Sequence, residues 1–182
     1  IVFSGGSEHP RVLEIPGAEL PGVRLAMEFL TQQNKRNAGD DETRAAPRGT
    51  LTATGKDVIV IGGGDTGSDC VGTSNRQGAK SVKCLYRRDR DNMPGSQREV
   101  KNAEEEGVEF VWLSAPKGFS GDTVSGVMVD RMRLGQPDAT GRQVPEIVAG
   151  ADYIEEADLV IKALGFEPED LPALWGVEEQ LR

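Results

Sequence analysis

Three glycines with the spacing G-x-G-x-x-G stand at Gly62, Gly64 and Gly67, directly after the β-branched run of residues 58–61. In this pattern the first glycine permits a tight turn out of a strand, the second lets a pyrophosphate approach the backbone, and the third lets the next helix lie close to the sheet. The start of that helix presents unpaired N–H groups and the positive end of its dipole to phosphate. We therefore predict a dinucleotide site here, a purely structural glycine turn being the alternative. The predicted phosphate-binding residues are Gly62, Gly63, Gly64, Asp65, Thr66 and Gly67.

The residue type about 20 positions further on indicates which cofactor is preferred. An NAD-preferring site carries Asp or Glu there, which binds the ribose 2′-hydroxyl. Arg87 and Arg88 occupy this position instead. A guanidinium there can hold a 2′-phosphate through charge-assisted hydrogen bonds, each worth on the order of 1.5–3 kcal/mol. We therefore predict that both arginines bind the cofactor and favour NADPH over NADH. The neighbouring Asp89 leaves a solvated charged loop as the alternative.

Other enzyme chemistry is hard to build from this sequence. The only histidine, His9, precedes the glycine segment and is typical of a polar loop, and neither tyrosine is followed four residues later by lysine. Cys70 and Cys84 are too far apart for a C-x-x-C motif, so we expect two buried, reduced thiols. Transfer of hydride to a flavin needs aligned rings rather than a general base. We predict no catalytic side chain and no metal ligand here.

The charge and hydropathy of the chain limit its partners. The 182 residues carry a net charge of -9, which argues against nucleic-acid binding. No stretch approaches the roughly 20 apolar residues that span a bilayer. We therefore expect neither a nucleic-acid nor a membrane partner, and a cytoplasmic location is consistent with reduced thiols. The chain begins within an apolar run, residues 1–3, so we expect an internal piece of a longer protein.

The pattern of apolar residues predicts an alternation of strands and helices. This order predicts an α/β fold, a Rossmann-like parallel sheet with helices on both faces and an inserted antiparallel hairpin or meander at about 119–150. Thr66 is expected to cap the second helix. We predict strands at 1–4, 58–61, 81–86, 108–113 and 157–164, helices at 23–34, 66–77 and 96–106, a polar linker after the first helix, and an antiparallel pattern at 123–148.

Four segments, residues 56–70, 86–95, 103–110 and 157–168, resemble the small (beta) subunits of glutamate synthase, among the FAD/NAD(P)-dependent pyridine nucleotide oxidoreductases. The resemblance covers nearly the whole chain. It implies an NADPH-binding domain inserted between two halves of an FAD-binding domain, and cofactor contacts from Ala163, Leu164 and Gly165. The implied divisions are 1–35 for the end of the first FAD half, 36–55 for a linker, 56–152 for the NADPH-binding domain, and 153–182 for the closing strand and the return to the FAD-binding domain.

The resemblance also implies a function for the whole protein. NADPH would reduce FAD, and iron–sulfur clusters outside this segment would pass electrons to a large subunit that makes glutamate. We expect the segment alone to be inactive, to bind NADPH weakly and to bind FAD hardly at all. The alternatives are a ferredoxin–NADP or dihydropyrimidine dehydrogenase-type electron-entry module and a non-catalytic nucleotide sensor. A flavin-disulfide reductase would carry a C-x-x-C pair, which this sequence lacks.

Overall fold

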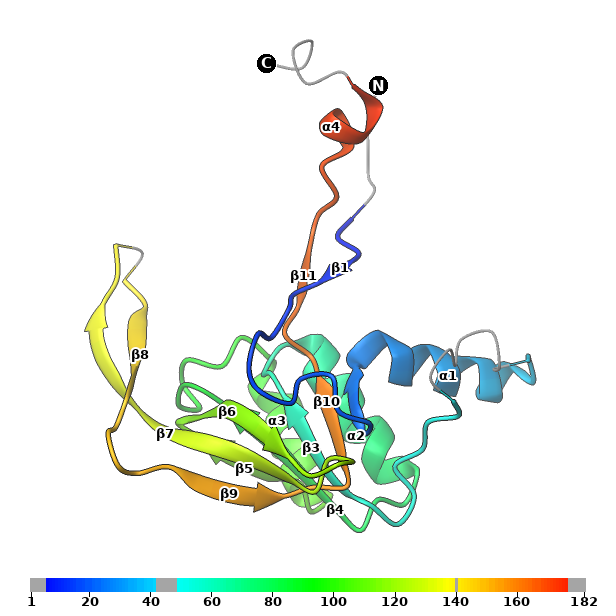
Figure 1. The fold of residues 1–182 in the computed structure, drawn as a ribbon, viewed down its shortest axis with the longest axis horizontal. Coiled ribbons are helices and arrows are strands. Elements are labelled where there is room, and N and C mark those ends of the chain that lie inside the picture. Colours follow the sequence, from blue (N-terminus) through cyan, green and yellow to red (C-terminus); the bar gives the residue numbers. More distant parts are fainter. Residues whose placement is uncertain (1–5, 42–48, 140, 177–182) are drawn as a thin grey trace.

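A computed structural model of the chain describes residues 6–41, 49–139 and 141–176. Its centre is a parallel sheet of five strands in the order β2-β10-β3-β4-β5 (Figure 1). The predicted strand at 1–4 lies outside the described residues. The strands of this sheet are β2 (Val23–Leu25), β3 (Asp57–Ile61), β4 (Ser81–Tyr86), β5 (Glu109–Trp112) and β10 (Leu159–Lys162).

The two faces of the parallel sheet are covered differently. Successive side chains of a strand point to opposite faces, so Val58 and Val60 of β3 join a core with Phe29 and Val71 from the helices. Ile59 and Ile61 join a second core that contains no helical residue and is completed by the antiparallel strands. The helices on the first face are α1 (Ala26–Ala38), α2 (Asp65–Arg76) and α3 (Gln97–Glu105).

The α/β class, the parallel sheet and the antiparallel insertion are confirmed. The expectation that helices cover both faces is wrong for the described residues, because the inserted strands bury the second face instead. These strands span residues 114–156, a wider range than the predicted 119–150. They are β6 (Ser114–Ser120), β7 (Gly126–Pro137), β8 (Gln143–Ile147) and β9 (Tyr153–Glu156).

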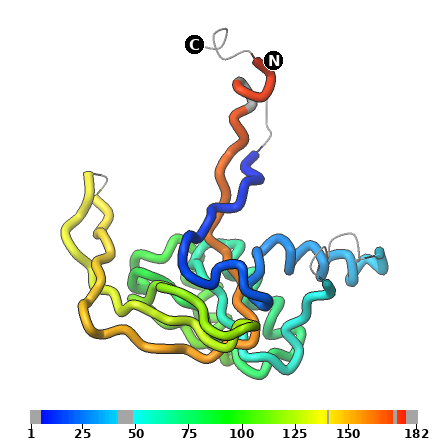
Figure 2. The backbone as a smooth tube through the Cα atoms, in the orientation of Figure 1, coloured from blue at the N-terminus to red at the C-terminus, as the bar shows by residue number. Residues whose placement is uncertain are grey.

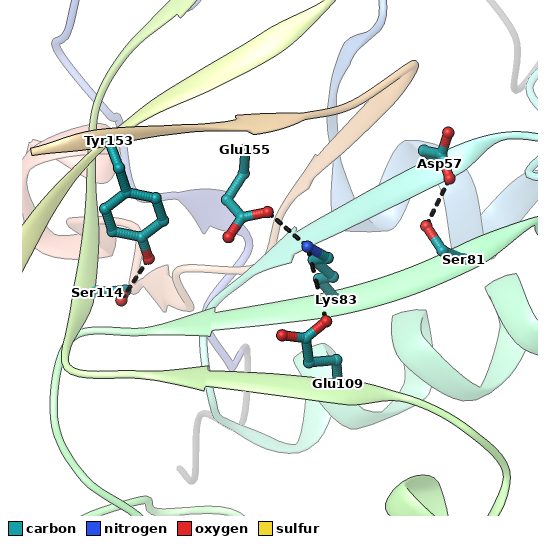
Figure 3. Close-up of polar contacts among 7 residues, drawn as sticks. All are labelled: Asp57, Ser81, Lys83, Glu109, Ser114, Tyr153 and Glu155. Atoms are coloured by element: carbon teal, nitrogen blue, oxygen red, sulfur yellow. Dashed lines mark hydrogen bonds and ion pairs between the residues drawn. The ribbon is translucent and has the colours of Figure 1, made fainter.

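Polar contacts fasten the antiparallel strands to the parallel sheet and to one another (Figure 3). Lys83 of β4 lies between two carboxylates, with Nζ 2.5 Å from Glu155 of β9 and 3.6 Å from Glu109 of β5. The hydroxyls of Ser114 and Tyr153 lie 2.9 Å apart and join β6 to β9. The β7–β8 hairpin extends beyond this anchored part as an arm (Figure 1).

A narrow ribbon leaves the body of the molecule, as the tube in Figure 2 shows. It consists of β1 (His9–Pro10) paired antiparallel with β11 (Phe166–Glu167), and α4 (Leu171–Trp175) follows it. His9 therefore lies in a strand rather than in a loop, and its side chain is exposed. The chain thus passes twice through the same narrow connection.

The first helix differs from its prediction at both ends. Residues 23–25, predicted as helical, form β2, because Val23 finds a parallel partner in Val160. The helix then continues to Ala38, into the segment predicted as a linker. Within that segment Leu51 and Ala53 are buried in the helical-face core. The domain divisions remain a prediction, but residues 23–38 pack on the parallel sheet.

Candidate functional site

The glycine turn joins the carboxyl end of β3 to the start of α2. Gly62 has φ of +127°, and a Cβ there would lie 2.2 Å from the carbonyl oxygen of Ala163. A Cβ on Gly67 would lie 2.4 Å from the carbonyl oxygen of Gly62, so α2 rests directly on the turn. A Cβ on Gly64 would meet nothing within 4 Å. The turn is therefore closely packed at Gly62 and Gly67 and open at Gly64.

The start of α2 presents unpaired amides at this opening. The N–H of Ser68 donates to the carbonyl of Gly64 at 3.1 Å and forms the first turn of the helix. The three amides before it, those of residues 65–67, therefore lack a helical partner. The N-cap is Gly64, without a side-chain hydrogen bond, so the prediction that Thr66 caps the helix is wrong. An uncapped helix start beside an open backbone turn suits an anion.

The segment Ala163–Leu164–Gly165 lies beside this turn. The N–H of Ala163 donates to the carbonyl of Ile61 at 2.8 Å, which continues the β3–β10 ladder up to the turn. A cleft of about 240 Å³ opens beyond it, lined by residues 163–165 together with Met27 of α1 and Lys162. The order of the strands reverses between β3 and β10. In open α/β sheets such a switch point, at the carboxyl ends of the strands, is where ligands bind.

The arginines after β4 have different environments. Arg87 is exposed, and no hydrogen bond or ion pair joins it to the described residues. Arg88 is 8% exposed, and its Nε donates to the carbonyl of Gln143 in β8 at 3.1 Å. Arg90 pairs with Glu104 of α3 at 3.0 Å. The structure thus leaves Arg87 available at the carboxyl edge, while a clamp formed by both predicted arginines stays a prediction.

The carboxylate of Asp89, which complicated the sequence-based choice of cofactor, belongs to the loop itself. Its Oδ1 accepts hydrogen bonds from the backbone N–H of Asn92 at 3.0 Å and from the Asn92 side chain at 2.7 Å. This pattern closes a local turn. Both hydrogen bonds hold this carboxylate oxygen within the loop, which weakens its competition for a phosphate-binding arginine.

Sequence reasoning missed the residues that join the loop after β4 to the glycine turn. The N–H of Gly95 donates to the carbonyl of Gly63 at 3.0 Å. Met93 and Tyr86 pack beside Gly63, and the Tyr86 hydroxyl donates to the carbonyl of Asn92 at 2.9 Å. The signal was present, since residues 92–95 carry part of the family resemblance, but no role could be assigned to them from the sequence.

Both cysteines are free and buried, as predicted. The thiol of Cys84 donates to the carbonyl of Gly62 at 3.4 Å. Burial raises the pKa of Cys84 to about 12 and also raises the pKa of Cys70 well above its ordinary value. Thiols in this state are protonated and unreactive at neutral pH. Within the described residues, no three His, Cys, Asp or Glu side chains are grouped as metal ligands, and no helix has the length and apolar character needed to cross a membrane.

A parallel sheet with an open glycine turn at its switch point defines the class of dinucleotide-binding α/β proteins. The sequence matches the family described as pyridine nucleotide-disulphide oxidoreductase over residues 1–180. The chain therefore belongs to this family.

Curated relatives agree with this assignment. The chain is 63% identical to the putative NADPH glutamate synthase small chain of Cereibacter sphaeroides over 180 residues, covering 98% of this chain and 43% of the relative. It is 57% identical to the NADPH glutamate synthase small chain of Azospirillum brasilense, with 94% and 36% coverage. A third relative, the NADPH-Fe(3+) oxidoreductase subunit beta of Geobacter sulfurreducens, is 44% identical, with 72% and 20% coverage. The chain thus spans less than half the length of these relatives.

Among solved structures, the chain is similar to Mycobacterium tuberculosis FprA in complex with NADPH, with a TM-score of 0.71 and 18% identity, covering 92% of this chain and 50% of FprA. Thioredoxin reductase from Giardia duodenalis gives a TM-score of 0.60 at 22% identity, with 88% and 42% coverage. At these identities the likeness shows the fold alone. It confirms the predicted α/β fold.

Proposed function

We propose that this chain is the NADPH-binding segment of a flavoprotein oxidoreductase of the glutamate synthase small-chain type. The observation that carries the proposal is the contrast among the three motif glycines. Side chains at Gly62 and Gly67 would collide with backbone, whereas Gly64 faces open space. A turn that merely joined β3 to α2 would not need a glycine at position 64, the second glycine of the motif. A phosphate that approaches the backbone there would need one.

The amides at the start of α2 would hold the pyrophosphate. The adenosine end of the cofactor would extend over β4 toward Arg87, because the second strand of such a unit places its last residues at the ribose. The exposed guanidinium of Arg87 would then hold the 2′-phosphate, with Arg88 as the second predicted contact. The chain has a net charge of -9, so its overall field repels an anionic ligand. An exposed arginine at this edge therefore supports the binding of a phosphate more strongly than it would in a basic protein.

The nicotinamide end would extend the other way, past Ala163, Leu164 and Gly165 toward the cleft beyond β10. When bound, NADPH supplies the electrons that a flavin takes up. The residues of this chain would orient the cofactor and exclude water from one side, and no acid or base would be required. FAD and iron–sulfur clusters would be held by parts of the protein outside this segment. The large subunit of glutamate synthase would be the partner, in the cytoplasm.

The β1–β11 ribbon supports the proposed insertion between two halves of an FAD-binding domain. Two strands from distant parts of the sequence leave the body together, as an inserted domain requires. A second candidate is an electron-entry module for another acceptor, which the 44% identical relative named NADPH-Fe(3+) oxidoreductase favours. The higher identity to glutamate synthase small chains over nearly the whole chain favours the first candidate.

Calorimetric titration of the full-length protein with NADP⁺ and NAD⁺ tests the nucleotide proposal without turnover. We expect tighter binding of NADP⁺, and equal affinities would contradict the assignment of Arg87. The absorbance spectrum of the same protein tests the flavin proposal, since a non-catalytic sensor would show no flavin bands. Adding a glutamate synthase large subunit with 2-oxoglutarate and glutamine tests the acceptor, and NADPH oxidation without glutamate formation would favour the second candidate.

A further inference from the structure

We propose that Gly95 is a positioning residue that holds the loop after β4 onto the glycine turn. It thereby sets the spacing between the pyrophosphate site and the 2′-phosphate site. This inference rests on the proposed function and adds a specificity determinant to it. The loop in question, residues 87–96, is called the arginine loop below.

The contact between the arginine loop and the turn is direct and close. The N–H of Gly95 donates to the carbonyl of Gly63 at 3.0 Å, and Gly95 is buried. A Cβ added at Gly95 would lie 3.0 Å from that same carbonyl oxygen. Because the obstructing atom belongs to the backbone of the turn, it cannot rotate away as a side chain would. An alanine at this position therefore shifts the loop or the turn by a few tenths of an ångström, and a larger residue shifts them further.

A small apolar cluster supports the same contact from inside the loop. Tyr86, Met93 and Val100 form a separate core that joins the end of β4, the arginine loop and α3. Carbon atoms of Tyr86 and Met93 lie 2.7 and 3.0 Å from the place where a Cβ of Gly63 would stand. The Tyr86 hydroxyl donates to the carbonyl of Asn92, which fixes the loop to the strand that ends at the arginines.

The spacing matters because one ligand would bind both sites. The 2′-phosphate and the pyrophosphate belong to the same adenosine unit, so the second contact is intramolecular once the first has formed. Its strength depends on how well the two sites are held at the matching distance. The turn is fixed to β4 at its base, where the N–H of Gly62 donates to the carbonyl of Leu85 at 3.2 Å. Gly95 provides the second fastening, on the arginine-loop side.

The test uses the full-length protein and calorimetric titration with NADP⁺ and NAD⁺. For Gly95→Ala we expect NADP⁺ affinity to fall about tenfold, equivalent to one charge-assisted hydrogen bond. The affinity for NAD⁺, which has no 2′-phosphate, should fall less, so the preference ratio shrinks. Tyr86→Phe loosens the loop without adding bulk, and should move the ratio in the same direction by a smaller factor even if Gly95→Ala does not fold.

Gly72→Ala in α2 is the matched control. Its new Cβ would also meet an atom at 3.0 Å, but that atom is the end of the flexible Arg76 side chain, so both affinities should remain unchanged. A purely structural role for Gly95 would lower both affinities by the same factor together with the melting temperature, and that result overturns the inference. An unchanged ratio in both Gly95→Ala and Tyr86→Phe also overturns it. After either of these two outcomes the proposed function still stands, provided that the unmutated protein binds NADP⁺ tightly through Arg87. If the unmutated protein binds neither nucleotide, the proposed function fails as well.

Discussion

Gly64→Ser should separate the stability of this fold from its ability to bind a nucleotide. Gly64 is the N-cap of α2, with φ of -94° and ψ of -179°, an extended conformation that serine adopts without strain. A Cβ there meets nothing within 4 Å, and serine is a better N-cap than glycine by a few tenths of a kcal/mol. We therefore expect the unfolding free energy to stay the same or to rise by about 0.5 kcal/mol. The melting temperature would rise by about 1–2 °C.

Nucleotide binding should change in the opposite direction. The serine side chain would stand where the pyrophosphate approaches the backbone, so at least one charge-assisted hydrogen bond of about 1.5–3 kcal/mol would be lost. This loss corresponds to a fall in affinity of roughly 10- to 150-fold. Calorimetric titration with NADP⁺ and thermal unfolding followed by circular dichroism would measure the two effects on one preparation. NAD⁺ should lose as much affinity as NADP⁺, because both carry the pyrophosphate.

Gly67→Ser is the matched control for this experiment. Its Cβ would lie 2.4 Å from the carbonyl oxygen of Gly62, so α2 would have to move off the sheet. Such overpacking costs about 1–3 kcal/mol, and both stability and affinity should fall. If Gly64→Ser binds NADP⁺ as tightly as the unmutated protein, the open face of the turn is not the phosphate site. The reasoning from the three glycines would then be refuted.

Three further predictions concern charges and thiols. Arg87→Ala should weaken NADP⁺ binding at least tenfold and leave NAD⁺ binding unchanged, while Arg90→Ala, whose side chain is engaged with α3, should have a smaller effect by the same titration. Cys84, whose pKa burial raises to about 12, should react with iodoacetamide at pH 8 only after denaturant unfolds the protein, as mass spectrometry would show. A hydrogen bond from Lys80 lowers the pKa of Asp57 in the folded protein. The stabilisation by the Asp57 carboxylate is therefore present above pH 3.8 and is lost as the pH falls through the lower pKa of the folded state. Urea titrations of Asp57→Asn and the unmutated protein should show a stability difference that vanishes in strong acid.

The parts of the fold that sequence could predict are those specified by local patterns. The β-branched run of β3, the glycines and the start of α2 follow one another within about 15 residues, and the structure agrees with that prediction closely. The covering of the second face could not be predicted in the same way. Alternating apolar residues in β7 show that one face is buried, but they do not say which surface buries it. Only the pairing of distant segments places the antiparallel strands over Ile59 and Ile61.

The two arginines illustrate a limit of sequence-based prediction. They follow the end of β4 and lie in a bend, where no regular spacing fixes the direction of a side chain. Arg87 is exposed to solvent, whereas Arg88 is buried and donates to the carbonyl of Gln143. The partner of Arg88 lies 55 residues away in an inserted strand, so no local pattern could identify it. The contact of Gly95 could not be predicted for the same reason, since its partner is a backbone atom of Gly63 in another segment.

If the chain binds a dinucleotide as proposed, the position of the ribbon would limit which end of the cofactor can take part in electron transfer. β11 begins at Phe166, with three residues between it and the carboxyl end of β10, and the cleft lined by Gly165 lies at the same edge. A flavin-binding domain carried by the ribbon would therefore face this cleft rather than the end of β4. Only the end of the dinucleotide beyond β10 would approach the flavin, while the end near Arg87 would serve recognition alone. Under the proposed function, recognition of the nucleotide and electron transfer would then lie on opposite sides of β3, and the segment would require no acid, base or redox-active thiol of its own.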